Sequence, residues 1–326
     1  MTDAVYQPIS KRSERPGDTA VTTFNLYNLF DEGRDVTVRI GGEWIRPSLP
    51  TQIAKLSLAI RHELNLPHIL AVQEVSSQAV LQRLGDAVNA ASGAAYRALS
   101  PSTSDRRGIQ IGFLYDERRV KLARAYQMEG TAVAAAFGPH SPNPGREPLV
   151  GEFRVNGRNL TLINNHFKSN YIPDEYTAET QERLAANLAQ RNAQARVVRD
   201  FVNTLLDRDP QALVLVTGDL NTSRRGGPEE AVVQPLRILA GRPSEPPLTS
   251  LLPLKRDIHE YTFIWEERNE ILDHVLVSPA LLALFAGVDV LHFNALYSEA
   301  EWLNGATAVR SSDHDPLEAR FQFLNV

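Results

Sequence analysis

The chain has 326 residues, of which 43% are hydrophobic and 22% are charged, and its formal net charge at pH 7 is −5. This length and balance are typical of a soluble globular protein with one large domain or two small ones. The absence of cysteine excludes disulfide bonds, thiolate metal sites and cysteine nucleophiles. Because the net charge is negative, the molecule as a whole would not attract polyanions. A nucleic-acid site would therefore require a local basic patch or a metal ion.

Residues 1–18 are polar and lack the apolar segment of a signal peptide. We expect them to be disordered or weakly docked. The sequence contains no run of about 18 apolar residues, so no membrane span is expected. A cytoplasmic location follows unless a leader has been removed.

The elements are predicted from periodicity and from turn residues. In chain order, the pattern predicts a strand at 21–25, a helix at 53–64, a strand at 68–74, a helix at 80–88, strands at 109–115 and 120–125, a hairpin at 149–155 and 160–165, a helix at 178–207, and strands at 212–217, 273–277, 288–293 and 319–324. Glycine and proline predict loops at 31–50, 137–148 and 222–256. Strands outnumber helices, which indicates packed sheets with helices outside and a functional rim.

Polar side chains recur where the predicted strands end. Asn25, Glu74 and Asp219 each close an apolar run, and Asp313-His314 precedes the last strand. An acid–histidine pair at a strand end suits general-base chemistry, because the strand fixes both side chains. One acid at a strand end is more often a solvated end or a helix cap, but this recurrence favours a shared site. Carboxylate and amide oxygens with few imidazoles favour Mg²⁺ or Mn²⁺ over Zn²⁺.

The ordered set of motifs resembles the endonuclease/exonuclease/phosphatase superfamily, which includes pancreatic deoxyribonuclease, abasic-site endonucleases, neutral sphingomyelinases and inositol-polyphosphate phosphatases. The motifs are Asn25, Gln73-Glu74, His166, Gly218-Asp219-Leu220-Asn221, Leu272-Asp273-His274 and Ser312-Asp313-His314. The resemblance implies a single domain over residues 19–326. Its fold would be α/β (α+β), a four-layer sandwich of two mixed β-sheets packed face to face with helices outside. Asn28 and the run His166–Ser169 are similar to a bacterial subgroup of predicted extracellular nucleases.

The resemblance also implies roles for the metal site and the attacking water. Glu74 would be the main ligand of Mg²⁺ (or Mn²⁺), with Asn25 and Asp313 completing the site. Asp219 and Asn221 would orient and activate the attacking water. Such a metal neutralises phosphate charge and polarises the P–O bond.

The remaining roles concern proton transfer and substrate binding. His314, held by Asp273, would bind the scissile phosphate or take a proton. His166 would stabilise developing charge or protonate the leaving oxygen. Arg146 would bind phosphate through its planar guanidinium, with Asn28 and Lys168 as further substrate contacts. Relatives often carry an acid that pairs with the equivalent of His166 near the position of Gln110, so this histidine is predicted to lack that partner.

The favoured function is a metal-dependent phosphodiesterase of nuclease type, with DNA as the expected nucleic acid. The alternative is a phosphoesterase acting on a small-molecule or lipid phosphate by the same chemistry. Arginines in 34–46 and 222–256 favour nucleic acid, while Trp44 and the run 248–254 are the apolar candidates for a lipid interface. A degenerate family member used as a binding module would have lost a central residue, and none is missing except the acid expected near Gln110. The oligomeric state is left open.

Overall fold

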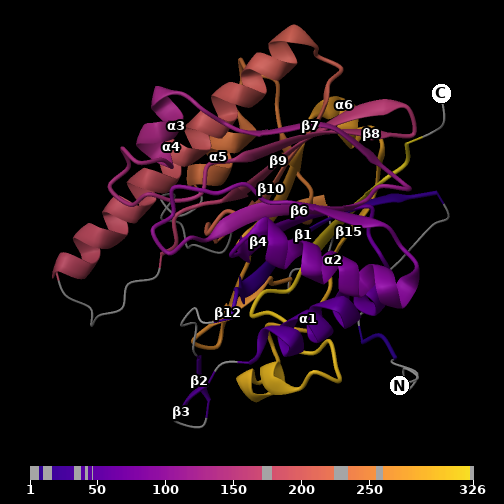
Figure 1. Cartoon of the computed structure of the whole chain (residues 1–326). Helices are drawn as coiled ribbons and strands as arrows, with labels where there is room; N and C mark the ends of the chain where they lie inside the picture. The colour runs from indigo at the N-terminus through magenta and orange to yellow at the C-terminus, as the bar shows by residue number, and fades with distance from the viewer. Residues whose placement is uncertain are drawn as a thin grey trace.

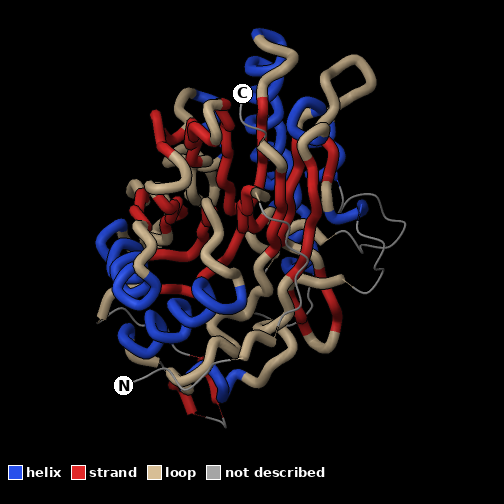
Figure 2. The backbone as a smooth tube through the Cα atoms, turned by 90° about the vertical axis from the view of Figure 1, so that its right-hand side faces the viewer, coloured by secondary structure: helices blue, strands red, loops and turns tan. Residues whose placement is uncertain are grey.

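The computed structural model describes residues 7–9, 17–32, 38–40, 43–45, 47–170, 178–223, 234–254 and 260–323. Two six-stranded sheets face each other and helices cover their outer faces (Figures 1 and 2). The predicted four-layer sandwich of mixed sheets is confirmed. The prediction of a disordered or weakly docked segment at 1–18 falls mostly outside the described residues.

The first sheet contains, in spatial order, β15 (Phe285–Val290), β16 (Leu317–Phe321), β1 (Thr19–Leu29), β4 (Ile69–Val75), β6 (Gln110–Asp116) and β5 (Tyr96–Leu99). The second contains β11 (Thr249–Ser250), β14 (Asp273–Val277), β10 (Leu213–Asp219), β9 (Arg158–His166), β8 (Leu149–Val155) and β7 (Lys121–Gln127). Within these sheets β1 pairs with β4, and β9 with β10, in parallel, and the other pairs are antiparallel. Because the strands of a parallel pair run in the same direction, their C-terminal ends lie at one edge of each sheet. Polar residues stand at that edge in both sheets.

Both faces of the central strands are buried, which explains their nearly continuous apolar sequence. In β4, Ile69 and Ala71 face the second sheet, whereas Leu70 and Val72 face the helices α1 (Leu49–Leu58) and α2 (Gln78–Ser92). Between the sheets, the rings of Phe113 and Phe153 meet edge to face with their centroids 5.4 Å apart. This packing fixes the distance between the polar residues at the ends of the two sheets.

The helices lie on opposite sides of the sandwich. The π-helix η1 (Ala59–Glu63) continues α1, and together with α2 these helices pack on the first sheet. On the second sheet lie α3 (Thr131–Ala136), α4 (Ala178–Arg208) and α5 (Gln234–Ala240). Shorter pieces complete the described structure: α6 (Pro279–Leu282), η2 (Leu252–Leu254) and η3 (Glu299–Leu303). Within the described ranges, no helix combines the length and the hydropathy that a membrane span needs.

Local signals explain several boundaries. The hairpin predicted from residues 149–155 and 160–165 turns at Asn156-Gly157, where both residues have the positive φ that a type I′ turn requires (45° and 82°). The helix α2 begins at Ser77, whose hydroxyl accepts a hydrogen bond from Val80 N, and stops at Gly93 in the left-handed conformation. The helix predicted at 178–207 is confirmed as α4.

The loop predictions were wrong in part. Residues 31–50 contain the paired strands β2 (Val38–Ile40) and β3 (Glu43–Ile45) and the start of α1, and the described part of 222–256 contains α5, β11 and η2. The hairpin of β12 (Phe263–Trp265) and β13 (Arg268–Glu270) was not predicted. These strands have two or three residues each, which is too short for a hydrophobic period to be recognised.

Candidate functional site

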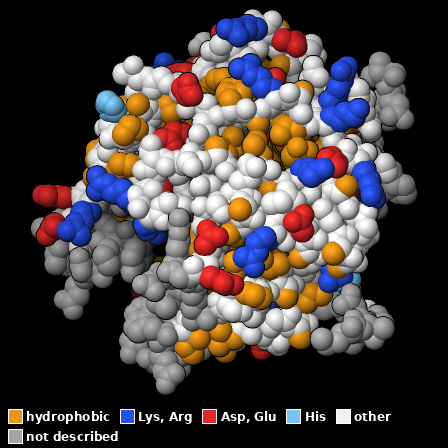
Figure 3. Space-filling view, in the orientation of Figure 1, with side chains coloured by type: hydrophobic (Ala, Val, Ile, Leu, Met, Phe, Trp, Pro, Cys, Tyr) orange, Lys and Arg blue, Asp and Glu red, His pale blue; other side chains and the backbone are white. Residues whose placement is uncertain are grey.

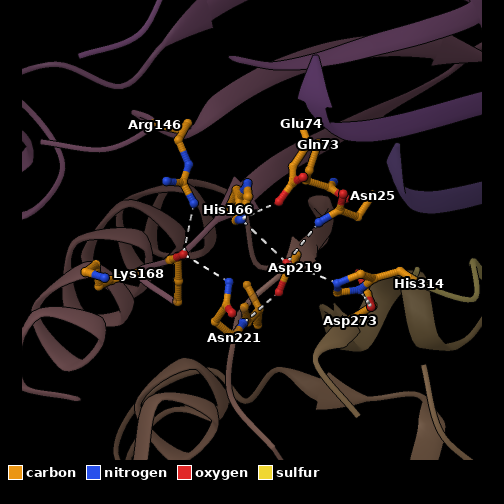
Figure 4. A network of polar contacts seen from close by, with 12 residues as sticks. Asn25, Gln73, Glu74, Arg146, His166, Lys168, Asp219, Asn221, Asp273 and His314 are labelled. Atoms are coloured by element: carbon orange, nitrogen blue, oxygen red, sulfur yellow. Dashed lines mark hydrogen bonds and ion pairs between the residues drawn. The ribbon is translucent and has the colours of Figure 1, made fainter. Parts of the chain in front are cut away.

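The residues predicted to form the site come from the same rim of both sheets. In the second sheet, Asp219 is paired in register with His166 on one side and with Asp273 on the other. In the first sheet, Asn25 is paired with Gln73. The two rows of polar residues face each other across the sandwich (Figure 4).

Glu74 leaves the regular strand at a β-bulge. Its φ is +60°, and the pairing of β4 with β6 shifts between Gln73 and Val75. Opposite the bulge, Asn28 also has a positive φ (54°), and its backbone N donates to Glu74 Oε2 at 3.0 Å. Positive φ in non-glycine residues is a strained conformation that persists where the surroundings enforce it, often at functional sites. The bulge thus aims the Glu74 carboxylate and the hydrogen bond holds it.

Asp219 is the centre of the network. Its Oδ2 accepts a hydrogen bond from Asn25 Nδ2 at 3.2 Å and lies 3.5 Å from His166 Nε2 and 3.9 Å from His314 Nε2 (Figure 4). Its Oδ1 accepts from Asn221 N at 2.9 Å. Burial raises the pKa of Asp219 to about 7, the nearby charge of His314 opposes this shift, and Asp273 adds to it.

His314 is oriented by a buried carboxylate. Its Nδ1 donates to Asp273 Oδ2 at 2.7 Å, and its other nitrogen faces Asp219. Burial alone would lower the pKa of His314, but its contact with Asp273 outweighs burial and raises the pKa well above the usual value. The imidazole is therefore a cation near neutral pH, with one N–H committed to Asp273.

His166 has the opposite electrostatic character. Burial, and then the positive charges of Arg146 and Arg107, lower the pKa of His166 well below its usual value, so the imidazole is neutral. Its Nδ1 is buried and has no hydrogen-bond partner within the described residues. Gln110, the residue expected to replace an acidic partner, instead accepts a hydrogen bond from Ser100 Oγ at 2.9 Å.

Asn25, Glu74 and Asp313 are the residues that could hold a metal ion. Burial, and then the neighbouring charge of Asp313, raise the pKa of Glu74, and a cation bound there would stabilise both carboxylates. The amide of Asn25 is fixed, since its Nδ2 donates to Asp219 and its Oδ1 accepts from Tyr27 N at 3.0 Å. In the described part of the chain, no three His, Asp or Glu side chains gather as a metal site. Two carboxylates and an amide oxygen nevertheless fit a hard divalent cation.

The predicted substrate-binding residues lie at different distances from this centre. Arg146 is buried beside it, where its Nη2 donates to Phe167 O at 3.1 Å and its Nη1 pairs with Asp105 at 3.0 Å. Asn221 Nδ2 donates to the same carbonyl at 3.2 Å. Lys168 stands farther out, at one end of the row of polar groups in Figure 4.

Sequence reasoning missed the residues that hold the last loop in place. Asn294 Nδ2 donates to His314 O at 2.8 Å, and Asn294 Oδ1 accepts from Ser312 N at 3.3 Å. Asp315 Oδ1 accepts from three consecutive backbone N–H groups, those of residues 293–295, at 2.8–3.2 Å. Asp315 adjoins the Asp313-His314 motif and could have been noticed there, whereas no sequence signal distinguishes Asn294.

Phe263 and Trp265 were also missed. The ring of Phe263 lies 4.8 Å from the imidazole of His314, and it stacks on Trp265 with an interplanar angle of 16° and a centroid distance of 6.5 Å. Trp265 is 47% exposed. An aromatic surface therefore adjoins the histidine end of the site.

Comparisons with known proteins agree with this fold. A model of the endonuclease/exonuclease/phosphatase family matches residues 20–306, and no protein of curated function matches the sequence. The structure of truncated Caenorhabditis elegans TDP2 superimposes with a TM-score of 0.59 at 18% identity, covering 93% of this chain and 97% of that one. D. rerio TDP2 complexed with a single-strand DNA product gives 0.57 at 16% identity, with coverages of 93% and 98%. A Bacteroides thetaiotaomicron mannosyl-6-phosphatase gives 0.55 at 17% identity, with coverages of 92% and 98%.

Proposed function

Because the chain belongs to the endonuclease/exonuclease/phosphatase family and is a hydrolase of phosphoric ester bonds, we propose that it is a metal-dependent phosphodiesterase that cleaves nucleic acid. DNA is the expected substrate. The observation that carries the proposal is the position of Asp219, a buried carboxylate whose Oδ2 lies 3.5 Å from His166 Nε2 and 3.9 Å from His314 Nε2.

Asp219 and Asn221 would orient the attacking water. The Asp219 carboxylate is fixed by the N–H of Asn221 and by Asn25 Nδ2, so its free acceptor positions have a defined direction. A water held by such a carboxylate can be aligned with the phosphorus atom for in-line attack. During the attack the water can transfer a proton to the carboxylate.

The two histidines would act on the phosphoryl oxygens. Charged His314 has its Nε2 N–H available to donate to a phosphate oxygen, because Asp273 occupies its Nδ1. Neutral His166 would donate to the leaving oxygen or stabilise its charge. A divalent cation, held by Glu74 with Asn25 and Asp313, would when bound neutralise the phosphate charge.

The aromatic surface supports a nucleic-acid substrate. Phe263 covers His314, and the exposed Trp265 extends this surface away from the site. Nucleobases stack on such rings without sequence preference, at about 1–3 kcal/mol per base. A base next to the scissile phosphate would thus have a partner.

A small-molecule phosphate ester is the second candidate. Glu266, Glu267 and Glu270 lie in the same hairpin as Trp265, and their charge is unfavourable for a polyanion. An exposed tryptophan can also pack against a sugar ring, and one of the similar structures is a mannosyl-6-phosphatase. On the face shown in Figure 3, acidic and basic side chains alternate and no basic patch gathers.

The long loops contribute little to the choice between these substrates. Arg34, Arg46, Arg224 and Arg225, which favoured nucleic acid, lie outside the described residues. In the apolar run 248–254, Leu248, Leu251 and Leu252 are buried and only Leu254 is an exposed large apolar side chain. This run therefore offers little to a lipid interface.

The test is hydrolysis in Mg²⁺, Mn²⁺ or EDTA of plasmid, single-stranded DNA, RNA, bis(p-nitrophenyl) phosphate, a hexose 6-phosphate and sphingomyelin. Asp219→Ala and Glu74→Gln serve as inactive controls. We expect metal-dependent cleavage of DNA that falls by about 10²–10⁴-fold in each variant, with the fold intact by circular dichroism. Hydrolysis of the sugar phosphate or the lipid alone would replace the nuclease assignment with the phosphoesterase one.

A further inference from the structure

Four basic residues gather on the side of the site away from His314. They are Arg107, Arg146, Lys168 and Arg191, and we call them the Lys168 cluster. Arg191 Nη1 donates to Lys168 O at 3.0 Å, and Lys168 N donates to Gln194 Oε1 at 2.9 Å. Two side chains of α4 thus hold the Lys168 backbone in place.

The cluster contains more positive than negative charge. Asp105 pairs with Arg146 at 3.0 Å and lies 3.9 Å from Arg107. Across the described residues, Lys168 and Arg191 have no acidic side chain within 4.0 Å, and the Lys168 ammonium donates only to Ser169 O at 3.2 Å. Among the residues that the structure describes, these two cations therefore have no carboxylate partner.

The cations of the cluster are partly buried, and the loss of hydrating water makes their charge energetically unfavourable. Arg191 is 2% exposed, and its Nε is buried without a hydrogen-bond partner in the described structure. Burial, and then the charges of Arg146, Arg191 and Arg107, lower the pKa of Lys168 to about 8. Cations that repel one another in this way are stabilised by an anion, and phosphate is a suitable one.

The cluster is connected to the centre of the site but is distinct from it. Arg146 and Asn221 donate to the same carbonyl, that of Phe167, from opposite sides. In Figure 4, Lys168 lies at one end of the polar row and His314 at the other, with Asp219 between them. A substrate phosphate at Asp219 and a second one at Lys168 would therefore occupy different places.

We propose that the Lys168 cluster binds the phosphate group next to the scissile one in a phosphodiester chain. Lys168 would make the contact. The buried Arg191 would hold the Lys168 carbonyl, Arg146 would hold the carbonyl of Phe167, and both would add positive charge. This inference rests on the proposed function and deepens it, since it requires a substrate with at least two linked phosphates.

The experiment compares a substrate that has one phosphate with one that has many. The kcat/KM of Lys168→Gln and Lys168→Arg is measured on bis(p-nitrophenyl) phosphate and on a single-stranded oligonucleotide. Lys121→Gln is the matched control, because Lys121 is exposed and lies at the opposite end of the second sheet.

Lys168→Gln should lower kcat/KM on the oligonucleotide roughly tenfold more than on the small diester, because a charge-assisted hydrogen bond is lost. The salt dependence of oligonucleotide binding should decrease by about 0.7 in slope. Lys168→Arg should retain most of the activity, and Lys121→Gln should behave as wild type. Equal losses of kcat/KM on both substrates, or no loss on either, would overturn the proposed role of the Lys168 cluster while leaving the nuclease assignment intact. A wild-type enzyme that cleaves the small diester but no nucleic acid would refute both.

Discussion

Gly218 allows two strands to approach closely beside Asp219. Its φ is +131°, and a Cβ at this position would lie 1.9 Å from Asn165 O on the paired strand β9. We expect Gly218→Ala to lower the free energy of unfolding by about 3 kcal/mol or more, because the backbone must shift. Urea denaturation of both proteins measures the loss. Gly145→Ala is the control, since its nearest neighbour would be 3.8 Å away; equal stability of the two variants would contradict this account.

His292 supports Asp315 from behind the site. Its Nδ1 lies 2.9 Å from Asp315 Oδ2, its Nε2 lies 3.5 Å from Glu260 Oε2, and its ring packs on Tyr261 with a centroid distance of 4.3 Å. Burial alone would lower the pKa of His292, but the contacts with the two carboxylates outweigh burial and raise the pKa to about 9. The protonated histidine thus holds the carboxylate that fixes residues 293–295.

The raised pKa makes this contribution depend on pH. Protonated His292 stabilises the fold fully below its unfolded pKa of roughly 6.5, and the effect is lost as the pH rises to about 9. We expect His292→Gln to cost on the order of 1 kcal/mol at pH 6, allowing for solvent screening, and little at pH 9.5. Urea denaturation at the two pH values measures this, with His140→Gln as an exposed control. A loss that does not change with pH would rule out the charged pair.

At the scale of elements, α1 is tied to the loop that carries Asp313 and His314. The Lys55 ammonium is buried and donates to three carbonyls, those of Asn304, Thr307 and Val309, at 2.9, 3.0 and 2.5 Å. The helix therefore holds the segment that leads into the site, although about 250 residues separate them in the chain.

Replacing Lys55 by methionine should free this segment. We expect Lys55→Met to lose about 2–3 kcal/mol of local stability, because three buried carbonyls lose their donor. Hydrogen exchange of residues 304–311 should become faster than in wild type, and phosphodiester hydrolysis should fall with it. Lys121→Met tests the loss of a lysine elsewhere. Unchanged exchange in 304–311 would show that the ammonium does not secure the loop.

At the scale of the whole molecule, the site is divided between the two sheets. Asn25 and Glu74 belong to the first sheet and Asp313 precedes its strand β16, whereas His166, Asp219 and Asp273 belong to the second. The expected metal ligands are thus on one side of the sandwich and the groups expected to orient the water are on the other. His314 follows Asp313 on the side of the metal ligands and reaches across to Asp273. The apolar core between the sheets sets the spacing between the two sets.

Metal binding should then stabilise the folded molecule independently of turnover. At a Mg²⁺ concentration of about 100 times Kd, binding to the folded state increases the free energy of unfolding by about 2.7 kcal/mol. This raises the thermal midpoint by several degrees. Glu74→Gln should abolish the shift, while Glu129→Gln, at an exposed acid, should retain it. Calorimetry with Mg²⁺ and with EDTA measures both. A shift that survives Glu74→Gln would place the cation elsewhere.

The sequence by itself determined the architecture and indicated most of the residues that are proposed for the site. A continuous apolar run such as Ile69–Val72 specifies a strand buried on both faces, because successive side chains of a strand point to opposite faces of the sheet. Asn156-Gly157 specifies its turn in the same way. Residues such as Glu74 and Asp219 could be proposed for the site because each stands at the end of an apolar run, and strand ends gather at a rim.

Only the tertiary structure decided the chemical state of those residues and their supports. His314 is charged because Asp273, which is 41 positions away in the chain, bonds its ring and raises its pKa. His166 is neutral because it is buried near arginines, which lowers its pKa. Arg191, Asn294 and Lys55 could not be predicted, since each acts through partners distant in the chain. The physical reason is that pKa values and hydrogen-bond partners depend on how deeply a residue is buried and on which distant residues lie next to it. Both follow from the packing of the two sheets, and no local sequence pattern contains them.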